Sequence, residues 1–345
     1  MTSDMVGEVT TERNPLLPDR YPAEDLFVCD ILDATPKGDM ASMEHPLFSL
    51  STNTDMKIRE YHNGDKKLTI TPSGSGLATV HDRDVLIFCI SQCMAALNAG
   101  KKVSRQLSVN AYDLLRATNR QDSGRGNDLL KAALRRLAGT RVETNIHQGG
   151  ELHTSNFGMI DGFSIKSETK NGRIQELQIT LSDWIFDAIQ NKNVLSMSRQ
   201  YFKLRKPIER RLYEIARKHC GKQVRWEVSL ENLQLKTGST STSKEFKRMI
   251  SAVILDNDRH SIIPDYSISL ESKNVVFRQK RPVLDSFSLP QLHPDTYEYA
   301  RTLAVGWDIR ALEAEWRDWV YFKKIKVRNV DANFVSFCKK KGKLE

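Results

Sequence analysis

The order of apolar and polar positions along the chain predicts a succession of three helices. Residues 82–100 begin with acidic side chains, continue through an almost wholly apolar stretch and end at a glycine, which predicts a buried helix. Ser108 is placed to cap a second helix, and the polar stretch 119–127 follows it as a turn. Residues 127–140 carry leucine and alanine on one helical face, so they predict a third, amphipathic helix.

Strand patterns follow this third helix directly. Residues 141–146 and 157–165 are rich in β-forming side chains, and residues 177–181 alternate strictly between apolar and polar. Three helices followed by a hairpin are typical of a winged helix, in which the last helix enters the major groove of DNA. We therefore predict a winged helix over residues 80–182, followed by a short helix that Ser182 or Asp183 caps.

The same order is predicted a second time. Pro207 suits the first turn of a helix that ends at Gly221, and Ser229 caps the next one after a short strand. A turn over residues 238–243 leads to an amphipathic helix over residues 244–254, and two alternating runs then predict a hairpin. The chain is thus predicted to have an α+β fold with two tandem winged-helix domains, each with its own small core.

These patterns divide the chain into four parts. We predict winged-helix domains at residues 45–198 and 199–282. Residues 1–44 contain four prolines and ten acidic against three basic side chains, a net charge of −7, and predict a flexible acidic leader. Residues 283–345 predict a helical extension. Its apolar stripe, with Trp316 and Trp319, needs a partner surface, which is either the body of the protein or another protein.

Charge changes the picture because it is concentrated. The chain has a net charge of +9, and residues 199–250 alone hold fourteen basic against five acidic side chains. Residues 101–141 hold ten basic against three acidic side chains. Two basic segments, each containing a predicted third helix, favour two contacts with a polyanion such as duplex DNA.

The candidate DNA-binding residues fall into three groups. Five face away from the apolar sides of the third helices and are candidates for contacts with base edges: Lys131, Arg135, Lys244, Lys247 and Arg248, with Arg136 beside them. Three lie at the starts of these helices and are candidates for phosphate contacts: Arg125, Asn127 and Ser243. Four in the segment 199–211 are candidates for a clamp between the domains, the alternative being a solvated linker helix: Arg205, Lys206, Arg210 and Arg211.

Composition and missing motifs argue against several other classes of protein. Five cysteines without metal-ligand spacing give no disulfide or metal scaffold, and Cys89 and Cys93 are predicted to be core residues. No segment is apolar over the roughly 20 residues that cross a membrane, and the start of the chain does not resemble a secretion signal, so we expect a cytoplasmic protein. Neither a phosphate-binding glycine loop nor a pair of histidines separated by one residue is present, so we expect no enzyme activity and no cofactor.

Four segments resemble the plasmid replication initiator protein A family: GLATVHDRDVLIFCISQCMAALNAG, LKAALRRLAGTRVETNI, LSDWIFDAI and LRKPIERRLYEIARKHCG. The resemblance covers about residues 45–280. It implies binding to repeated duplex DNA sequences at a plasmid origin, local opening of the duplex and recruitment of the host initiator and replicative helicase. Dimerisation through the first domain is also implied. A winged-helix transcriptional repressor is the main alternative, and a winged-helix scaffold that binds only proteins is a third.

Overall fold

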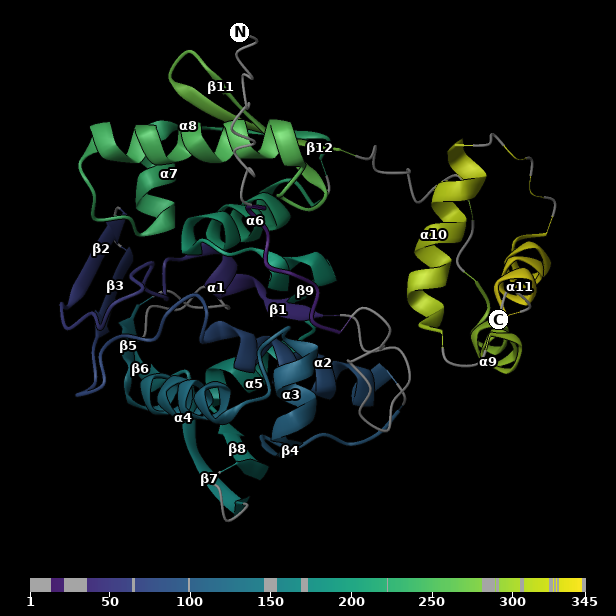
Figure 1. Ribbon diagram of the computed structural model, residues 1–345, viewed down its shortest axis with the longest axis horizontal. Coiled ribbons are helices and arrows are strands. Elements are labelled where there is room, and N and C mark those ends of the chain that lie inside the picture. Colours follow the sequence, from purple (N-terminus) through teal and green to yellow (C-terminus); the bar gives the residue numbers. More distant parts are fainter. Residues whose placement is uncertain are drawn as a thin grey trace, which may run out of the picture.

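Helices and strands are mixed throughout the protein, whose structure is a computed structural model (Figure 1). The described residues are 14–21, 36–63, 66–98, 100–145, 154–168, 173–221, 223–280, 289, 292–304, 307–322, 325, 327 and 329–342. No helix in this part of the chain is both long enough and apolar enough to cross a membrane.

The first half of the chain contains a unit of helices and a three-stranded antiparallel sheet. Its elements are α2 (Arg83–Asn98), β4 (Gln106–Asn110), α3 (Ala111–Ala117), α4 (Gly124–Gly139), β7 (Ile160–Glu168) and β8 (Ile174–Leu181). The strands lie in the order β4-β8-β7. Leu177, Ile179 and Leu181, the apolar half of the predicted alternation, are all fully buried. After the sheet, α5 (Asp183–Gln190) follows its predicted N-cap, Ser182.

The second half repeats this order of elements and strand pairing. Its elements are α6 (Pro207–His219), β10 (Arg225–Ser229), α7 (Leu230–Thr237), α8 (Ser243–His260), β11 (Tyr266–Glu271) and β12 (Asn274–Gln279). The strands lie in the order β10-β12-β11, which matches the first sheet position by position. Pro207 is at the start of α6 and Ser229 caps α7, as predicted. The repetition expected from the sequence is therefore present in the structure.

A four-stranded sheet, which the sequence pattern did not predict, flanks the first unit. It consists of β2 (Arg59–Asn63), β3 (Lys66–Thr71), β5 (Arg141–Thr144) and β6 (Ser155–Gly158), in that order. The prediction of a single strand over residues 157–165 was wrong, because β6 and β7 belong to different sheets. Both pieces carry β-forming side chains, so their pattern does not reveal the change of sheet. The helix predicted to start at Ser108 instead follows β4, and its N-cap is Asn110.

Part of the predicted leader belongs to the folded body. Residues 36–44 contribute β1 (Lys37–Asp39), which pairs with β9 (Val194–Ser196), and α1 (Met40–Glu44), whose Met43 is fully buried. The prediction that the leader extends to residue 44 was therefore wrong. Residues 14–21 also contact the body, since Leu17 N–H donates to the Lys203 carbonyl at 2.8 Å. The other leader residues lie outside the described part of the chain.

The two repeated units share one hydrophobic core, although the sequence predicted one for each. A continuous cluster of buried side chains runs from α2 to α6 and on to α8. Tyr201 and Phe202, in the 3₁₀ helix η1 (Arg199–Lys203), are buried within it, and Tyr201 lies against Tyr213 of α6. The boundary predicted at residues 198 and 199 stays a prediction. Cys89 and Cys93 are buried in this core, as expected.

The C-terminal helices form a second core of their own. They are α9 (Pro294–Leu303), α10 (Ile309–Phe322) and α11 (Val330–Lys341), and they lie together at one side of the molecule (Figure 1). Trp316 is fully buried and donates from Nε1 to Asn333 Oδ1 at 2.7 Å. The partner of Trp316 is thus a neighbouring helix of the chain itself, whereas Trp319 stays 38% exposed.

Candidate nucleic-acid interface

Helix α8 presents three cations on its solvent side. Its N-terminus is closed by a capping box, in which Glu245 N–H donates to Thr242 Oγ1 at 3.3 Å and the Glu245 carboxylate accepts from Thr242 N–H. One face of α8 is buried in the core, and the opposite side carries Lys244, Lys247 and Arg248, all exposed. None of the three pairs with an acidic side chain among the described residues. Their charge is therefore directed into solvent, as predicted.

Ser243 was predicted to contact phosphate at the start of this helix. The structure places it as the first residue of α8, exposed to solvent, while Thr242 is the capping residue. The amide groups of the first helical turn satisfy only part of their hydrogen-bonding capacity within the helix, so this end is suited to an anion. Ser243 keeps its candidate role.

Helix α4 presents a smaller basic surface. Ser123 caps it by accepting from Gly126 N–H at 3.1 Å, and Leu130, Leu134 and Leu137 are fully buried. Arg125 and Arg135 are exposed, and Lys131 is half-buried. These three keep their predicted place on the solvent side of the helix. Only glycine fits at position 126 in the first turn of α4, because a Cβ there would lie 1.8 Å from the carbonyl oxygen of residue 121.

Asn127 is a correction to the predicted site. It is only 2% exposed, donates from Nδ2 to the Ser123 carbonyl at 2.9 Å and accepts from Ile174 N–H at 2.9 Å. Its side chain therefore joins α4 to β8 and is not available to DNA. Asn257 makes a similar connection in the second unit, from α8 to the start of β11, where it accepts from Ile263 N–H at 2.8 Å and donates to the Tyr266 carbonyl at 3.3 Å.

Alanine at either asparagine is expected to destabilise the fold. Asn127→Ala leaves the buried Ile174 N–H without an acceptor, and Asn257→Ala does so for Ile263, which costs about 1 to 3 kcal/mol for each. Urea denaturation of the full chain measures the change in free energy of unfolding. Asn232→Ala, at an exposed position of α7, is the matched control and should change stability by less than about 0.5 kcal/mol. Equal stability of all three variants would contradict this assignment.

Arg136 is also occupied by the fold. Its Nε and Nη2 atoms donate to the two carboxylate oxygens of Asp82, each at 2.7 Å. This bidentate hydrogen bonding, which outweighs the effect of burial, raises the pKa of Arg136 above its usual value. A side chain held this way has a structural role, so we withdraw Arg136 from the candidate DNA-binding residues.

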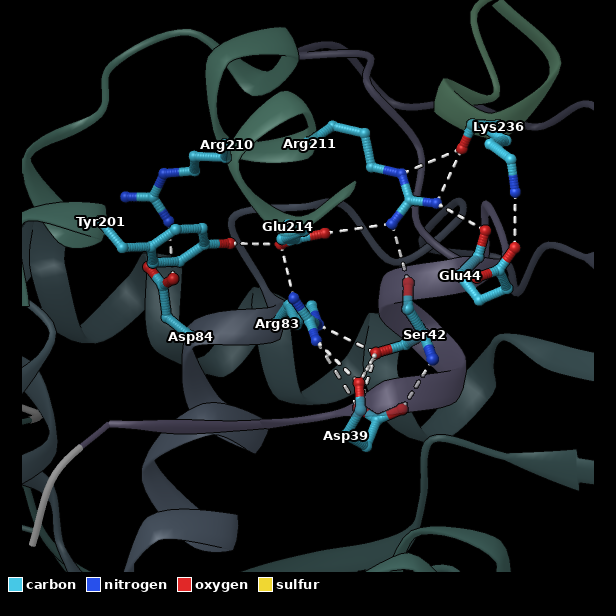
Figure 2. Close-up of polar contacts among 10 residues, drawn as sticks. All are labelled: Asp39, Ser42, Glu44, Arg83, Asp84, Tyr201, Arg210, Arg211, Glu214 and Lys236. Atoms are coloured by element: carbon cyan, nitrogen blue, oxygen red, sulfur yellow. Dashed lines mark hydrogen bonds and ion pairs between the residues drawn. The ribbon is translucent and has the colours of Figure 1, made fainter. Parts of the chain in front are cut away.

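The clamp was predicted to consist of four basic residues in the segment 199–211. The prediction was wrong for Arg210 and Arg211. Arg210 and Arg211 are each 2% exposed and lie inside the molecule. Figure 2 shows them in a buried network of ion pairs: Arg210 Nη1 is 2.6 Å from Asp84 Oδ1, and Arg211 Nη1 is 3.2 Å from Glu214 Oε2. The alternative prediction, a linker helix with its basic face in water, fails for the same reason.

The other two members of that group stay nearer the surface. Lys206 is exposed and its Nζ atom lies 2.7 Å from Asp256 Oδ2 of α8. Arg205 is half-buried and donates to the Leu16 carbonyl at 3.4 Å. Both side chains already bind neighbouring segments of the chain, so neither is free to contact DNA as the predicted clamp requires.

Two exposed cations on the hairpins were missed by the sequence-based prediction. Lys273 lies in the turn between β11 and β12, and Arg173 lies just before β8. The sequence could have indicated Lys273, because it is a basic residue in the turn between two strands of alternating pattern. The hairpin lies next to the third helix in each unit, so these residues extend the two basic surfaces.

Comparison with known proteins agrees with this architecture. A protein of Wigglesworthia glossinidia brevipalpis, named as a replication protein, is 37% identical over 275 residues, which cover 78% of this chain and 98% of that protein. The crystal structure of domains 2 and 3 of RctB superposes with a TM-score of 0.52 over 68% of this chain and 95% of that one, at 12% identity. This second likeness shows the fold alone.

The family match covers most of the shared core. Residues 37–268 match the family described as Replication initiator protein A, so the match begins at β1, eight residues before the segment expected from the sequence, and ends within β11. Helices α9 to α11 lie outside it. With the 37% identity over most of the chain, this match shows that the protein belongs to the replication initiator protein A family.

Proposed function

We propose that the protein initiates plasmid replication by binding duplex DNA through two winged-helix units. The observation that carries this proposal is the repetition of one order of elements, each time with exposed cations on the third helix. In a winged helix this helix lies in the major groove and the hairpin contacts the adjacent backbone. Helices α4 and α8 are accordingly the two recognition helices of the proposal.

The charges on these helices suit two different tasks. Contacts with phosphates supply affinity that falls as the salt concentration rises, because bound counterions are released. Contacts with base edges supply sequence preference, and an arginine or lysine paired with guanine is the commonest of them. Lys247 and Arg248 of α8, together with Arg135 of α4, are the side chains that we assign to base edges. Arg125, Ser243 and Lys244 lie near the helix starts and are assigned to the backbone.

The proposal also includes the steps after DNA binding. Family membership supports origin recognition, and we infer local duplex opening and recruitment of the host initiator and helicase from the same resemblance. We further infer that the protein acts by binding alone, without catalysis or a cofactor of its own. A repressor without a replication role would share the DNA-binding surface, so the test has to measure replication itself.

Plasmid maintenance provides that test. A plasmid that carries the gene and its flanking DNA should be lost within a few generations when Lys247 and Arg248 are both replaced by alanine, because α8 then loses two DNA contacts. Lys101→Ala with Lys102→Ala removes the same charge from an exposed loop between α2 and β4 and should leave maintenance unchanged. Normal maintenance by the stably folded α8 variant would contradict the proposal. The repressor would be favoured by a different result: the wild-type chain binds DNA, yet deletion of its gene does not affect plasmid maintenance.

A further inference from the structure

The start of α2 lies between the two repeated units and makes ion pairs to both. Asp82 is bound by Arg136 of α4, through the bidentate pair already described. The next residue, Arg83, is fully buried, and its Nη1 atom lies 2.5 Å from Glu214 Oε1 of α6. Asp84, which comes next in the chain, is paired with Arg210 of α6. Three consecutive residues thus join the third helix of the first unit to the first helix of the second.

Arg211 continues this connection toward α8. Its Nε and Nη2 atoms donate to the Lys236 carbonyl, at 3.1 and 2.7 Å, and its Nη1 atom donates to the Ser42 carbonyl at 2.8 Å. Lys236 belongs to the last turn of α7, and α8 begins only a short loop later, at Ser243. Figure 2 shows how this arginine reaches from α6 to α1 on one side and to the end of α7 on the other.

The centre of the network is closed to water, since Arg83, Tyr201 and Glu214 are all buried. Tyr201 donates from its hydroxyl group to Glu214 Oε1 at 2.6 Å, and Asp39 Oδ2 lies 3.7 Å from Arg83 Nη2. Burial opposes ionisation of Glu214, but the guanidinium groups of Arg83 and Arg211 outweigh it and lower the pKa of this carboxyl group. The ion pairs are therefore present throughout the neutral range of pH.

A buried ion-pair network of this kind does little for net stability, since desolvation of the charges offsets their attraction. Apolar side chains of the same volume would pack at least as well. What the ion pairs add is direction, because each guanidinium donates its hydrogen bonds only in its own plane and at fixed distances. The apolar core that the two units share is close-packed, and the network further restricts this packing to the orientation in which the charged groups meet their partners.

We propose that the buried network of Asp39, Arg83, Asp84, Tyr201, Arg210, Arg211 and Glu214, which we call the ionic lock, fixes the relative orientation of α4 and α8. The protein then recognises DNA sites whose two half-sites have one spacing and one helical phase. The selectivity for one spacing of half-sites rests on the proposed DNA-binding function. Its structural part, the fixed orientation, stands without DNA.

The structural part is tested by the distance between α4 and α8 in solution. Spin labels are attached to cysteines at the exposed positions Arg135→Cys and Lys247→Cys, in a chain with Cys29→Ser; the four other cysteines are all buried. Double electron–electron resonance should give one narrow distance distribution for this chain. In the double variant Asp84→Leu with Arg210→Met, which replaces an ion pair by apolar side chains of similar size, the distribution should become at least twice as wide.

The exposure of Arg120 and one further variant keep this test decisive. Arg120, the other partner of Asp84, is 17% exposed, so it retains access to water when Asp84 is replaced. Tyr201→Phe removes one hydrogen bond from the lock without leaving a charge unpaired, and should widen the distribution to a lesser degree. A folded variant of either kind that keeps the wild-type width would overturn the ionic lock, and so would a broad distribution in the unaltered chain.

The functional part is tested with the spacing between half-sites. A site is first selected from random duplex DNA with the wild-type chain, and five base pairs are then inserted between its half-sites. This turns one half-site to the opposite face of the duplex, because a helical turn is about 10 base pairs. The wild type should lose at least tenfold in affinity. The double variant should lose less than threefold and should bind a single half-site within twofold of the wild type.

The outcomes separate the two proposals. Equal sensitivity to the insertion in the wild type and the folded double variant would overturn the ionic lock as a determinant of spacing. If no duplex sequence is selected, the proposed function fails, while the distance distributions still decide whether the lock holds the two helices.

Discussion

Replacing Lys244, Lys247 and Arg248 together by alanine is expected to weaken binding to the selected duplex site by roughly two to three orders of magnitude. Each base-edge contact contributes about 1 to 3 kcal/mol, and each phosphate contact contributes through counterion release. All three side chains are exposed and lie opposite the buried face of α8, so their removal should leave the fold intact. The loss of affinity therefore does not arise from unfolding.

Fluorescence anisotropy at several salt concentrations measures this effect. The slope of log affinity against log salt should become shallower by about 1, because Lys244 is the one of the three side chains that we assign to a phosphate. The matched control removes three exposed lysines elsewhere, with Lys57→Ala, Lys101→Ala and Lys102→Ala in one chain. If control and α8 variant lose affinity equally, net charge and not the helix is responsible, and the recognition-helix assignment is wrong.

Glu214→Gln is expected to lower the free energy of unfolding by about 3 to 5 kcal/mol, because it leaves two buried guanidinium groups without their shared counter-ion. Arg83 is fully buried and Arg211 is 2% exposed, so water cannot replace the carboxylate. Glutamine has the same shape but offers one acceptor oxygen and no charge. The effect should exceed that of any single substitution on the basic faces of α4 and α8.

Urea denaturation of the full chain measures this change, with Glu231→Gln as the matched control. Glu231 lies on α7 and is exposed, so its replacement should change stability by less than about 0.5 kcal/mol. A cost below about 1 kcal/mol at Glu214 would show that the carboxylate is dispensable and would contradict its description as the buried counter-ion of Arg83 and Arg211.

The sequence predicted the local structure well where one chain segment carries all the information. Pro207, Ser182 and Ser229 mark the starts of helices because the capping interactions are made within a few residues. The alternation over residues 177–181 identifies a half-buried strand because side chains of a strand point to opposite faces. The exposed cations of α8 could be assigned since its apolar positions define the face that is buried.

Strand partners and sheet membership were beyond these local signals. Residues 157–165 split between two sheets, and β2 and β3 were not predicted at all. Residues 36–44 carry no sustained pattern, yet β1 pairs with β9 more than 150 residues later along the chain, its Gly38 opposite Leu195. Pairing at such separation depends on the other elements that bring the strands together.

The charge pattern and the order of helices and strands are properties of the sequence itself, because periodicity and capping act over a few residues. The tertiary structure alone decided which basic residues of the segment 199–211 are buried. Arg210 and Arg211 occur in a basic segment like many others, and only the folded chain places Asp84 and Glu214 within reach of their guanidinium groups. Burying an arginine needs a partner, and the partner of Arg210 lies 126 residues away in the sequence.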